Sequence, residues 1–419
     1  MSMDHSNSEP LAIFGGPKAK RTPFPTGKRH GDLEKRLLGE VIDSDMLFYF
    51  LGTKVFELQR RFARMYGVKH AIACSSGTAA VHIAIASLAL PAGSEVIVPA
   101  ITDMGSLTGI LYQGLVPVFA DVEPDTLNIC PASTKKLITG KTRAILAVHH
   151  SGLAAGMDAL LGIGREHGIP VVEDCAQAYC CDYQGKLAGT MGTVSAFSLN
   201  HFKHITCGSG GVVLTDDDQL RYRASLYLDK CFQREEGIRN PFFVAPNYQM
   251  TEMQGAVALA QLEKVDEIVT RRRTLGERLD RQLAALPAIF PQKTPAGQKH
   301  SYFLYLFRLD LGTLHCTADE FADAVKAEGI PCAARQITGG RPIYLYDLFQ
   351  KRSAFPGTSY PFAEDRYYRE GDCPIAEEAF KRWITMNIYE HYTEQDIDEI
   401  AVGIGKVARH FASRQAVRA

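Results

Sequence analysis

Residues 197–217 read FSLNHFKHITCGSGGVVLTDD, and this stretch decides the fold because it places one lysine between two apolar segments. Lys203 follows the apolar run AFSL and precedes three glycines, after which VVLT is typical of a buried strand. Glycines in a tight loop between two strands let the backbone approach a bound group closely. An amine on such a loop can be desolvated, which lowers its pKa towards that of a nucleophile. The stretch alone is equally typical of an ordinary loop lysine.

Length and composition predict a globular protein with two domains. The chain has 419 residues, of which 46% are hydrophobic and 22% are charged. Its net charge is -1, with 46 basic and 47 acidic residues well mixed along the sequence. This balance argues against binding to nucleic acid or to an anionic membrane, so we expect a small-molecule partner.

The sequence predicts a cytoplasmic location and no metal site. No apolar run reaches the length of about 18 residues that a membrane span needs, and the polar start MSMDHSNSEP does not resemble a signal peptide. The ten cysteines are scattered and form no C-x-x-C pair. We therefore expect reduced, largely buried thiols without disulfides or zinc.

Strands and helices alternate through the first half of the chain. Short apolar strands are expected in HAIAC, EVIVPA, PVFADV, RAILAVHH and VVED, with helices between them, one of them at residues 157–167. This order is typical of an α/β fold with a mostly parallel sheet that is covered on both faces. Ligands of such sheets bind at the carboxyl ends of the strands.

Two groups of residues are expected at those strand ends. Ser76, Gly77 and Thr78 begin a helix, where free N–H groups favour a phosphate, although a serine that caps a core helix has the same sequence pattern. Glu173 and Asp174 directly follow an apolar strand. Asp174 either caps the next turn or holds a protonated heterocyclic nitrogen.

The chain is expected to divide at a helical stretch that begins at Met250. We predict an N-terminal arm in residues 1–30, a large domain in residues 31–265 and a smaller C-terminal domain in residues 266–419. Residues 335–372 are rich in Gly, Pro and Tyr and irregular. A loop of this length inside a compact domain is usually functional.

Four motifs in order carry a family resemblance: SSGTAA, VVEDCAQAY, AFSLNHFK and APNYQMTEMQGAVALAQL. With this order and spacing, the chain resembles the DegT/DnrJ/EryC1/StrS family of pyridoxal-phosphate (PLP) enzymes over nearly its whole length. LAIFGGPKA and CPIAEEAFKRWITMNIYEHYTEQDIDEI resemble its sugar and aminocyclitol aminotransferase branches. The resemblance implies fold type I of the PLP-dependent transferases, which is aspartate aminotransferase-like, and a homodimer with shared active sites.

The resemblance also implies a role for each motif residue. Lys203 would carry the cofactor and move the proton between the amino donor and the cofactor, and Asp174 would pair with the pyridinium nitrogen. The cofactor-binding residues implied by the resemblance are Gly77, Thr78, Asp174, Gln177 at the phenolic oxygen, Ser198 at the phosphate, Lys203, and Asn247 from the neighbouring subunit.

Four positions depart from the family pattern. Asp103 stands where relatives commonly stack an aromatic ring on the cofactor, and it either caps the following helix or binds the acceptor. Tyr179, Gln249 and Ser209 also differ from the usual residues, and we expect these positions on the substrate side. His149 and His150 could assist there, although a hydrogen-bonded structural role is expected for at least one of them.

The function expected from the resemblance is amino transfer from L-glutamine or L-glutamate to a keto group on a nucleotide-linked sugar or a cyclitol. A PLP-dependent sugar dehydratase is one alternative, but relatives of that kind replace the lysine with histidine, and Lys203 argues against it. A protein that binds PLP or a sugar without turnover is the other alternative, suggested by Asp103 and Gln249.

Overall fold

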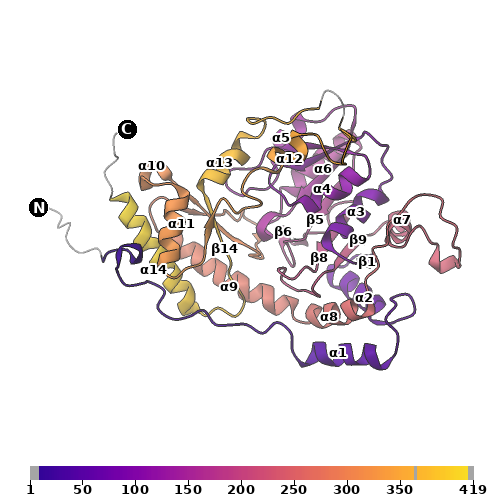
Figure 1. Cartoon of the computed structure of the whole chain (residues 1–419), viewed down its shortest axis with the longest axis horizontal. Helices are drawn as coiled ribbons and strands as arrows, with labels where there is room; N and C mark the ends of the chain where they lie inside the picture. Colours follow the sequence, from indigo (N-terminus) through magenta and orange to yellow (C-terminus); the bar gives the residue numbers. More distant parts are fainter. Residues whose placement is uncertain (1–8, 363–365, 414–419) are drawn as a thin grey trace, which may run out of the picture.

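A seven-stranded sheet forms the centre of the larger part of the protein, in a computed structural model that describes residues 9–362 and 366–413 (Figure 1). The strand order is β1-β9-β8-β5-β4-β2-β3. The strands are β1 (His70–Cys74), β2 (Glu95–Pro99), β3 (Val116–Ala120), β4 (Thr142–Val148), β5 (Val171–Asp174), β8 (Val194–Ser198) and β9 (Gly211–Thr215).

The sheet is mostly parallel, as the sequence predicted. Pairings among β2, β3, β4, β5 and β8 are all parallel, and only β9 runs against its neighbours β1 and β8. Every residue of β2, β3, β5, β8 and β9 is buried. Both faces of these strands are therefore covered, which explains why their sequences are nearly continuous apolar runs.

Helices surround this sheet. They are α1 (Asp32–Asp43), α2 (Lys54–Tyr66), α3 (Gly77–Ser87), α4 (Met104–Tyr112), α5 (Pro131–Lys136), α6 (Met157–His167), α7 (Asp218–Leu228) and α8 (Glu252–Leu262). Helix α3 contacts β1, β8 and β9, whereas α6 contacts β4 and β5. Nine of the eleven residues of α3 are buried, so this helix is apolar on all sides and lies in the core.

The second core lies around a four-stranded antiparallel sheet of order β10-β12-β14-β13. Its elements are β10 (Ile289–Pro291), β12 (Tyr305–Leu309), β13 (Ala333–Ala334), β14 (Trp383–Met386), α9 (Val265–Leu283), α10 (Leu311–Leu314), α11 (Ala318–Ala327) and α14 (Glu394–Ala412). A small sheet of β6 (Asp182–Tyr183), β7 (Lys186–Leu187) and β11 (Gln298–Lys299) links residues from both halves of the chain.

The helical stretch after Met250 is two helices and not one. Helix α8 ends at Leu262 and α9 begins at Val265. The turn between them lets Gln261 and Lys264 both reach the carboxylate of Glu34 in α1, at 2.7 and 2.5 Å. Helix α9 then contributes to both cores, through Val269 near its start and Leu279 near its end.

The C-terminal part of the chain does not pack only around the second sheet. Residues 335–372 carry the short helices η4 (Ile343–Leu345) and α12 (Asp347–Gln350), and α13 (Pro374–Arg382) follows. Tyr344, Phe349 and Tyr368 pack on Phe119 of β3, with ring centroids 5.2 to 5.7 Å apart. This long loop therefore covers the β3 edge of the large sheet.

The N-terminal arm runs along the outside of both parts, as the indigo trace in Figure 1 shows. Apart from the short helix η1 (Ala12–Phe14), its described residues have no helix or strand before α1. Leu11 is buried in the second core, whereas Arg29 reaches the loop between β8 and β9.

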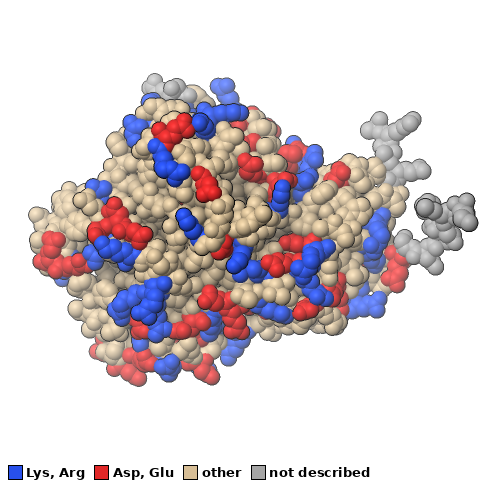
Figure 2. Space-filling view, turned by 180° about the vertical axis from the view of Figure 1, so that it is seen from behind, with Lys and Arg blue, Asp and Glu red and all other residues tan. Residues whose placement is uncertain are grey.

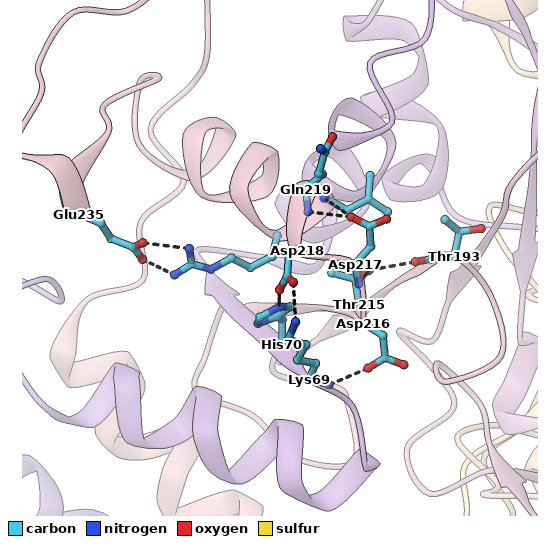
Figure 3. Close-up of polar contacts among 11 residues, drawn as sticks. Lys69, His70, Thr193, Thr215, Asp216, Asp217, Asp218, Gln219 and Glu235 are labelled. Atoms are coloured by element: carbon cyan, nitrogen blue, oxygen red, sulfur yellow. Dashed lines mark hydrogen bonds and ion pairs between the residues drawn. The ribbon is translucent and has the colours of Figure 1, made fainter.

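Carboxylates tie the end of β9 to the start of β1 (Figure 3). Asp217 caps α7 by accepting the N–H groups of Gln219 and Leu220. Its neighbour Asp216 accepts the N–H of Lys69 at 2.7 Å, and Asp218 contacts the His70 ring at 2.6 Å. These contacts fix the strand that leads to the Ser76 turn.

The surface carries mixed charge. On the face shown in Figure 2, acidic and basic side chains are interspersed without a continuous patch of one sign. All ten cysteines are free, and six of them are buried. Within residues 9–362 and 366–413, the structure has no helix that is both long and apolar enough to cross a bilayer.

Candidate active site

A cavity of about 410 Å³ opens at the carboxyl ends of the parallel strands. Its wall is formed by the ends of β4, β5 and β8, by the first residues of α3 and α4, and by two segments from the C-terminal half. The predicted site residues on this wall are Gly77, Thr78, Asp103, Asp174, Gln177, Ser198 and Lys203. The topology therefore brings together residues that are more than 120 positions apart in the sequence.

The turn before α3 has the features of an anion site. Ser76 caps the helix, with its hydroxyl accepting the N–H of Ala79 at 3.0 Å. A Cβ on Gly77 would lie 2.5 Å from the Cβ of Ser198, so only glycine allows β8 to come this close. The N–H groups of the first helical turn have no partner within the helix, and the helix dipole adds positive potential there.

Lys203 lies on the loop between β8 and β9 and lines the cavity. Its Nζ atom is 4.3 Å from the centre of the Phe303 ring. Burial lowers the pKa of Lys203, and the carboxylates of Asp174 and Asp103 oppose this shift only in part. A lower pKa gives a larger fraction of neutral, nucleophilic amine.

The loop of Lys203 is held from outside by Arg29, a residue that the sequence analysis missed. Its guanidinium donates to the carbonyl oxygens of His201, Lys203 and His204. The carbonyl of Arg29 in turn accepts hydrogen bonds from Gln261 and Lys264. No sequence motif marks this residue, because the contact joins the arm to a loop more than 170 positions away.

Asp174 is 4% exposed at the end of β5. One carboxylate oxygen accepts the N–H of Ala176 at 3.0 Å, and the other accepts the hydroxyl of Ser106 at 2.7 Å. Burial raises the pKa of Asp174 in spite of these hydrogen bonds. A cation in the cavity would reverse this shift, so the carboxylate fits a protonated heterocyclic nitrogen. The bond to Ala176 shows that Asp174 caps a turn, as one of the two readings of the sequence predicted, and this role leaves the carboxylate on the cavity wall.

Gln177 lines the same cavity in a fixed orientation. Its side-chain oxygen accepts the N–H of Ser151 at 2.6 Å. Because a backbone N–H can only donate, the amide oxygen must face Ser151, and the NH₂ group is left to donate to a bound ligand.

Asp103 caps α4, as the simpler of its two readings predicted. Its Oδ1 atom accepts the N–H of Gly105 at 2.8 Å. The residue also lines the cavity, where its charge partly opposes the lowering of the Lys203 pKa by burial and adds to the raising of the Asp174 pKa by burial. Capping and ligand binding are therefore compatible at this position.

Two expected substrate residues do not reach the cavity. Tyr179 is fully buried beneath it, packs on Phe62 and Phe197, and donates its hydroxyl to the carbonyl of Ser198 at 3.0 Å. Its expected place on the substrate side is wrong, because the aromatic core takes the ring. Gln249 is not on the wall either, whereas Ser209 is.

Asn247 lies on the exposed surface and not on the cavity wall of its own chain. It follows the segment of Ile238, Phe242 and Val244, whose exposed fractions are 43%, 63% and 96%. Apolar side chains so open to solvent are typical of an interface with another chain.

His149, the first of the two histidines after β4, is held by two hydrogen bonds. His149 accepts the N–H of Ala155 with Nδ1, so its Nε2 donates to Glu173, at 2.9 Å. Glu173 also accepts N–H groups of Gly189, Met191 and Gly192. Burial alone would raise the pKa of Glu173, but the bonds from His149, Gly192 and Gly189 outweigh it and lower the pKa. These groups lie close to Cys175, but their hydrogen bonds make the cluster structural. His149 is the structural histidine that was expected.

The fold and this site together define an aminotransferase of the PLP-dependent class, fold type I. A crystal structure of 3-amino-5-hydroxybenzoic acid synthase superimposes with a TM-score of 0.82 at 26% identity, covering 93% of this chain and 99% of that one. The structure of DesI with its TDP-sugar product gives a TM-score of 0.79 at 26% identity, with 97% of each chain covered.

The chain belongs to the DegT/DnrJ/EryC1/StrS aminotransferase family, whose model matches residues 29–404. It is 33% identical to the L-glutamine:2-deoxy-scyllo-inosose aminotransferase of Streptomyces paromomycinus, over 96% of this chain and 98% of that protein. It is also 33% identical to the GDP-perosamine synthase of Caulobacter vibrioides, over 85% and 91%. The resemblance read from the four motifs is confirmed.

Proposed function

We propose that the chain binds PLP in this cavity and transfers an amino group from L-glutamine or L-glutamate to the keto group of a cyclitol or a nucleotide-linked sugar. The observation that carries the proposal is the convergence of a desolvated amine, a buried carboxylate and an anion-binding turn in one cavity. Relatives whose names give these substrates support the donor and the two acceptor classes.

The residues of the cavity fit the cofactor. The phosphate would be held by the N–H groups of Gly77 and Thr78 and by the hydroxyl of Ser198, at the positive end of α3. Gln177 would donate to the phenolic oxygen, and Asp174 would hold the proton on the ring nitrogen. Lys203 would attach the cofactor.

When bound, PLP supplies an electron sink for the negative charge that forms at the substrate carbon next to the nitrogen. Asp174 keeps the ring nitrogen positively charged, because its buried carboxylate is stabilised by that cation. Lys203 would take the proton from Cα of the donor in the first half-reaction, and in the second it would deliver a proton to the acceptor carbon that gains the amino group. Phe303 and Leu304 line the cavity, and their apolar side chains would limit the access of water to this amine.

We also propose a homodimer in which Asn247 of the partner subunit reaches the cofactor phosphate. The exposed position of Asn247 and the apolar surface beside it support a contact with another copy.

The two alternative functions, a sugar dehydratase and a binding protein without turnover, have less support. The lysine at position 203 disfavours the dehydratase, and the convergent proton-transfer groups disfavour binding without turnover.

The cofactor assignment is tested by borohydride reduction of the purified protein. The protein should absorb visible light, and reduction followed by peptide mapping should place the cofactor on Lys203. Lys203→Ala should lose the adduct, whereas Lys186→Ala, at an exposed lysine of β7, should keep it. An adduct on another residue would overturn the assignment.

The reaction is tested by mass detection of products from pairs of amino donors and keto acceptors. L-Glutamine or L-glutamate with a keto cyclitol or a nucleotide-linked keto sugar should give the aminated product. Elimination of a hydroxyl group from the sugar, without amination, would favour the dehydratase.

A further inference from the structure

The amine of Lys203 lies against an aromatic ring and not against a carboxylate. Its Nζ atom is 4.3 Å from the centre of the Phe303 ring, a distance at which the electron-rich face of the ring attracts an ammonium group. Asp174 and Asp103 act on the amine through their charge alone, without a hydrogen bond to it. A buried ammonium group usually pairs with a carboxylate that is near, so the contact with Phe303 competes with two such partners.

Both carboxylates remain able to accept a further hydrogen bond. Asp174 accepts from Ser106 and Ala176, and Asp103 accepts the N–H of Gly105. The two oxygens of a carboxylate offer about four acceptor positions, so these bonds do not exhaust either group. A lack of acceptors therefore does not explain why the amine stays on the ring.

The segment that carries Phe303 is bonded to the loop that carries Lys203. The Nε2 atom of His204 lies 2.9 Å from the carbonyl oxygen of Ser301, and this nitrogen donates, because a carbonyl can only accept. The N–H of Ser301 in turn donates to the carbonyl of Gly152 at 2.8 Å. A Cβ on Gly152 would lie 2.5 Å from the Oγ atom of Ser301, so glycine allows this close approach. These contacts fix the position of the Phe303 backbone relative to the amine.

The other titratable groups beside this amine cannot form an ion pair with it. His150 and His204 are buried, and burial lowers the pKa of both, to about 4 for His150. Both imidazoles are therefore neutral near pH 7. Arg29 is itself a cation and donates to carbonyl oxygens of the lysine loop. Within the described part of this chain, Asp174 and Asp103 are thus the groups that could capture the ammonium group.

We propose that Phe303 is a positioning residue for Lys203, and that its ring holds the amine apart from Asp174 and Asp103. This inference rests on the proposed function, because PLP needs the amine and the Asp174 carboxylate at different places. Its aldehyde carbon and its ring nitrogen lie at opposite ends of the pyridine ring. An ion pair between Lys203 and Asp174 would occupy both groups before the cofactor binds, whereas an aromatic face attracts the ammonium group more weakly and leaves the carboxylate free.

The test measures the pKa of Lys203 in the cofactor-free protein. Acetic anhydride labels the neutral amine, so the labelling rate of Lys203 against pH, read by mass spectrometry relative to the exposed Lys186, gives this pKa. In Phe303→Leu, which stays apolar but lacks the ring, the pKa should rise by about one unit, because the released amine pairs with a carboxylate. Labelling below the pKa should then fall about tenfold. Phe303→Tyr keeps the ring and should stay within about 0.3 of the wild-type pKa.

A change of background identifies the cause of the rise. In a protein that carries Asp174→Asn and Asp103→Asn, Phe303→Leu should not raise the pKa of Lys203, because a neutral amide does not stabilise an ammonium group by charge. A rise that persists in this background would overturn the inference. So would an unchanged or lower pKa in Phe303→Leu alone, which is the result expected if the ring only attracts the amine.

Phe290→Leu is the matched control. The ring of Phe290 lies 4.7 Å from the guanidinium carbon of Arg308 and is not on the wall of this cavity, so its loss should leave the pKa of Lys203 unchanged. A rise in Phe290→Leu equal to that in Phe303→Leu would overturn the inference, since the effect would not be specific to the ring beside the amine.

The cofactor gives a separate result on the same samples. PLP should protect Lys203 of the wild type from acetylation and give visible absorbance. If PLP does neither, the proposed function fails, whereas the pKa values of the cofactor-free variants still decide whether Phe303 holds the amine away from the carboxylates.

Discussion

Burial of Asp174 destabilises the charged form of its carboxylate unless a cation lies beside it. Its carboxylate is almost fully buried, and burial raises its pKa although Ser106 and Ala176 donate to it. We therefore infer that a cationic group of a ligand binds favourably beside the Asp174 carboxylate. The hydrogen bond from Ser106 to Asp174 could not be predicted from the sequence, because serine is common in the first turn of a helix without contacting a distant side chain.

Asp174→Asn should keep the cofactor but lose most of the turnover. The oxygen of asparagine can accept the N–H of Ala176, and its NH₂ group can donate to the Ser106 hydroxyl, which can act as an acceptor. The neutral amide cannot hold a proton on the ring nitrogen by charge. We expect kcat to fall by about 10²-fold or more, with the visible absorbance of the bound cofactor retained. A loss of only a few-fold would mean that Asp174 acts mainly as a turn cap.

Asp103 invites a separate test, because it caps α4 and lines the cavity at the same time. Asn and Ser can both cap a helix, so Asp103→Asn and Asp103→Ser should leave the melting temperature nearly unchanged. If the carboxylate binds the acceptor, kcat/KM for the acceptor half-reaction should fall about tenfold or more while the donor half-reaction is largely spared. Equal damage to both half-reactions would point to support of the cofactor instead.

At the scale of elements, a buried ion pair joins three helices. Glu34 of α1 accepts from Gln261 at the end of α8, from Lys264 at the start of α9 and from the N–H of Gly31. These bonds lower the pKa of Glu34 to about 2 from an ordinary value of 4.5. The contact holds the turn between α8 and α9 in place. Gln261 in this region also donates to the carbonyl of Arg29, whose guanidinium holds the loop of Lys203.

The sign of the pH effect follows from this lowered pKa. A carboxylate with a depressed folded-state pKa stabilises the fold above its unfolded pKa, and the stabilisation is lost as the pH falls towards the folded value. Glu34→Gln should therefore lower the free energy of unfolding by about 1–3 kcal/mol at pH 7. Its deficit relative to the wild type should shrink between pH 4.5 and pH 2.

Urea unfolding at several pH values measures this difference. Glu40→Gln is a matched control, since Glu40 is in the same helix but makes its ion pairs, with Arg36 and Lys54, at the exposed surface, where such pairs contribute little. Its deficit should be smaller than that of Glu34→Gln at pH 7. A deficit of Glu34→Gln that is constant with pH would show that the charge of Glu34 does not stabilise the fold.

At the scale of the whole molecule, the cavity needs residues from both halves of the chain. Asp174 and Ser198 come from strands of the large sheet and Lys203 from the loop between β8 and β9, whereas Phe303 and Thr338 come from the C-terminal half. Asn247 stays outside the cavity of its own chain, so a complete site as we propose it needs a second copy.

Mixing inactive variants tests the shared site. Lys203→Ala and Asn247→Ala chains should each be inactive or nearly so, and the mixture should regain activity, because half of the sites in a heterodimer carry both native residues. With random exchange, about a quarter of all sites should be intact. Proven subunit exchange without any recovery would contradict the role of Asn247 across the interface, and a monomer in solution would contradict the dimer.

The sequence by itself determined the alternation of strands and helices, the parallel sheet, and the motif residues at its strand ends. It could do so because burial on both faces leaves continuous apolar runs, and because a parallel sheet puts the ends of its strands at one edge. Gly77, Asp174 and Lys203 therefore meet as their positions in the motifs predicted.

Only the tertiary structure decided the contacts between segments without a local pattern. The direction of Tyr179 depended on the space between Phe62 and Phe197, and the break after α8 depended on Glu34 in a distant helix. The roles of Arg29 and Phe303 likewise arise where the arm and the C-terminal half pack on the lysine loop and the cavity. Side-chain direction and long-range packing leave no periodic signal in a sequence, because they are fixed by the free energy of the whole folded chain.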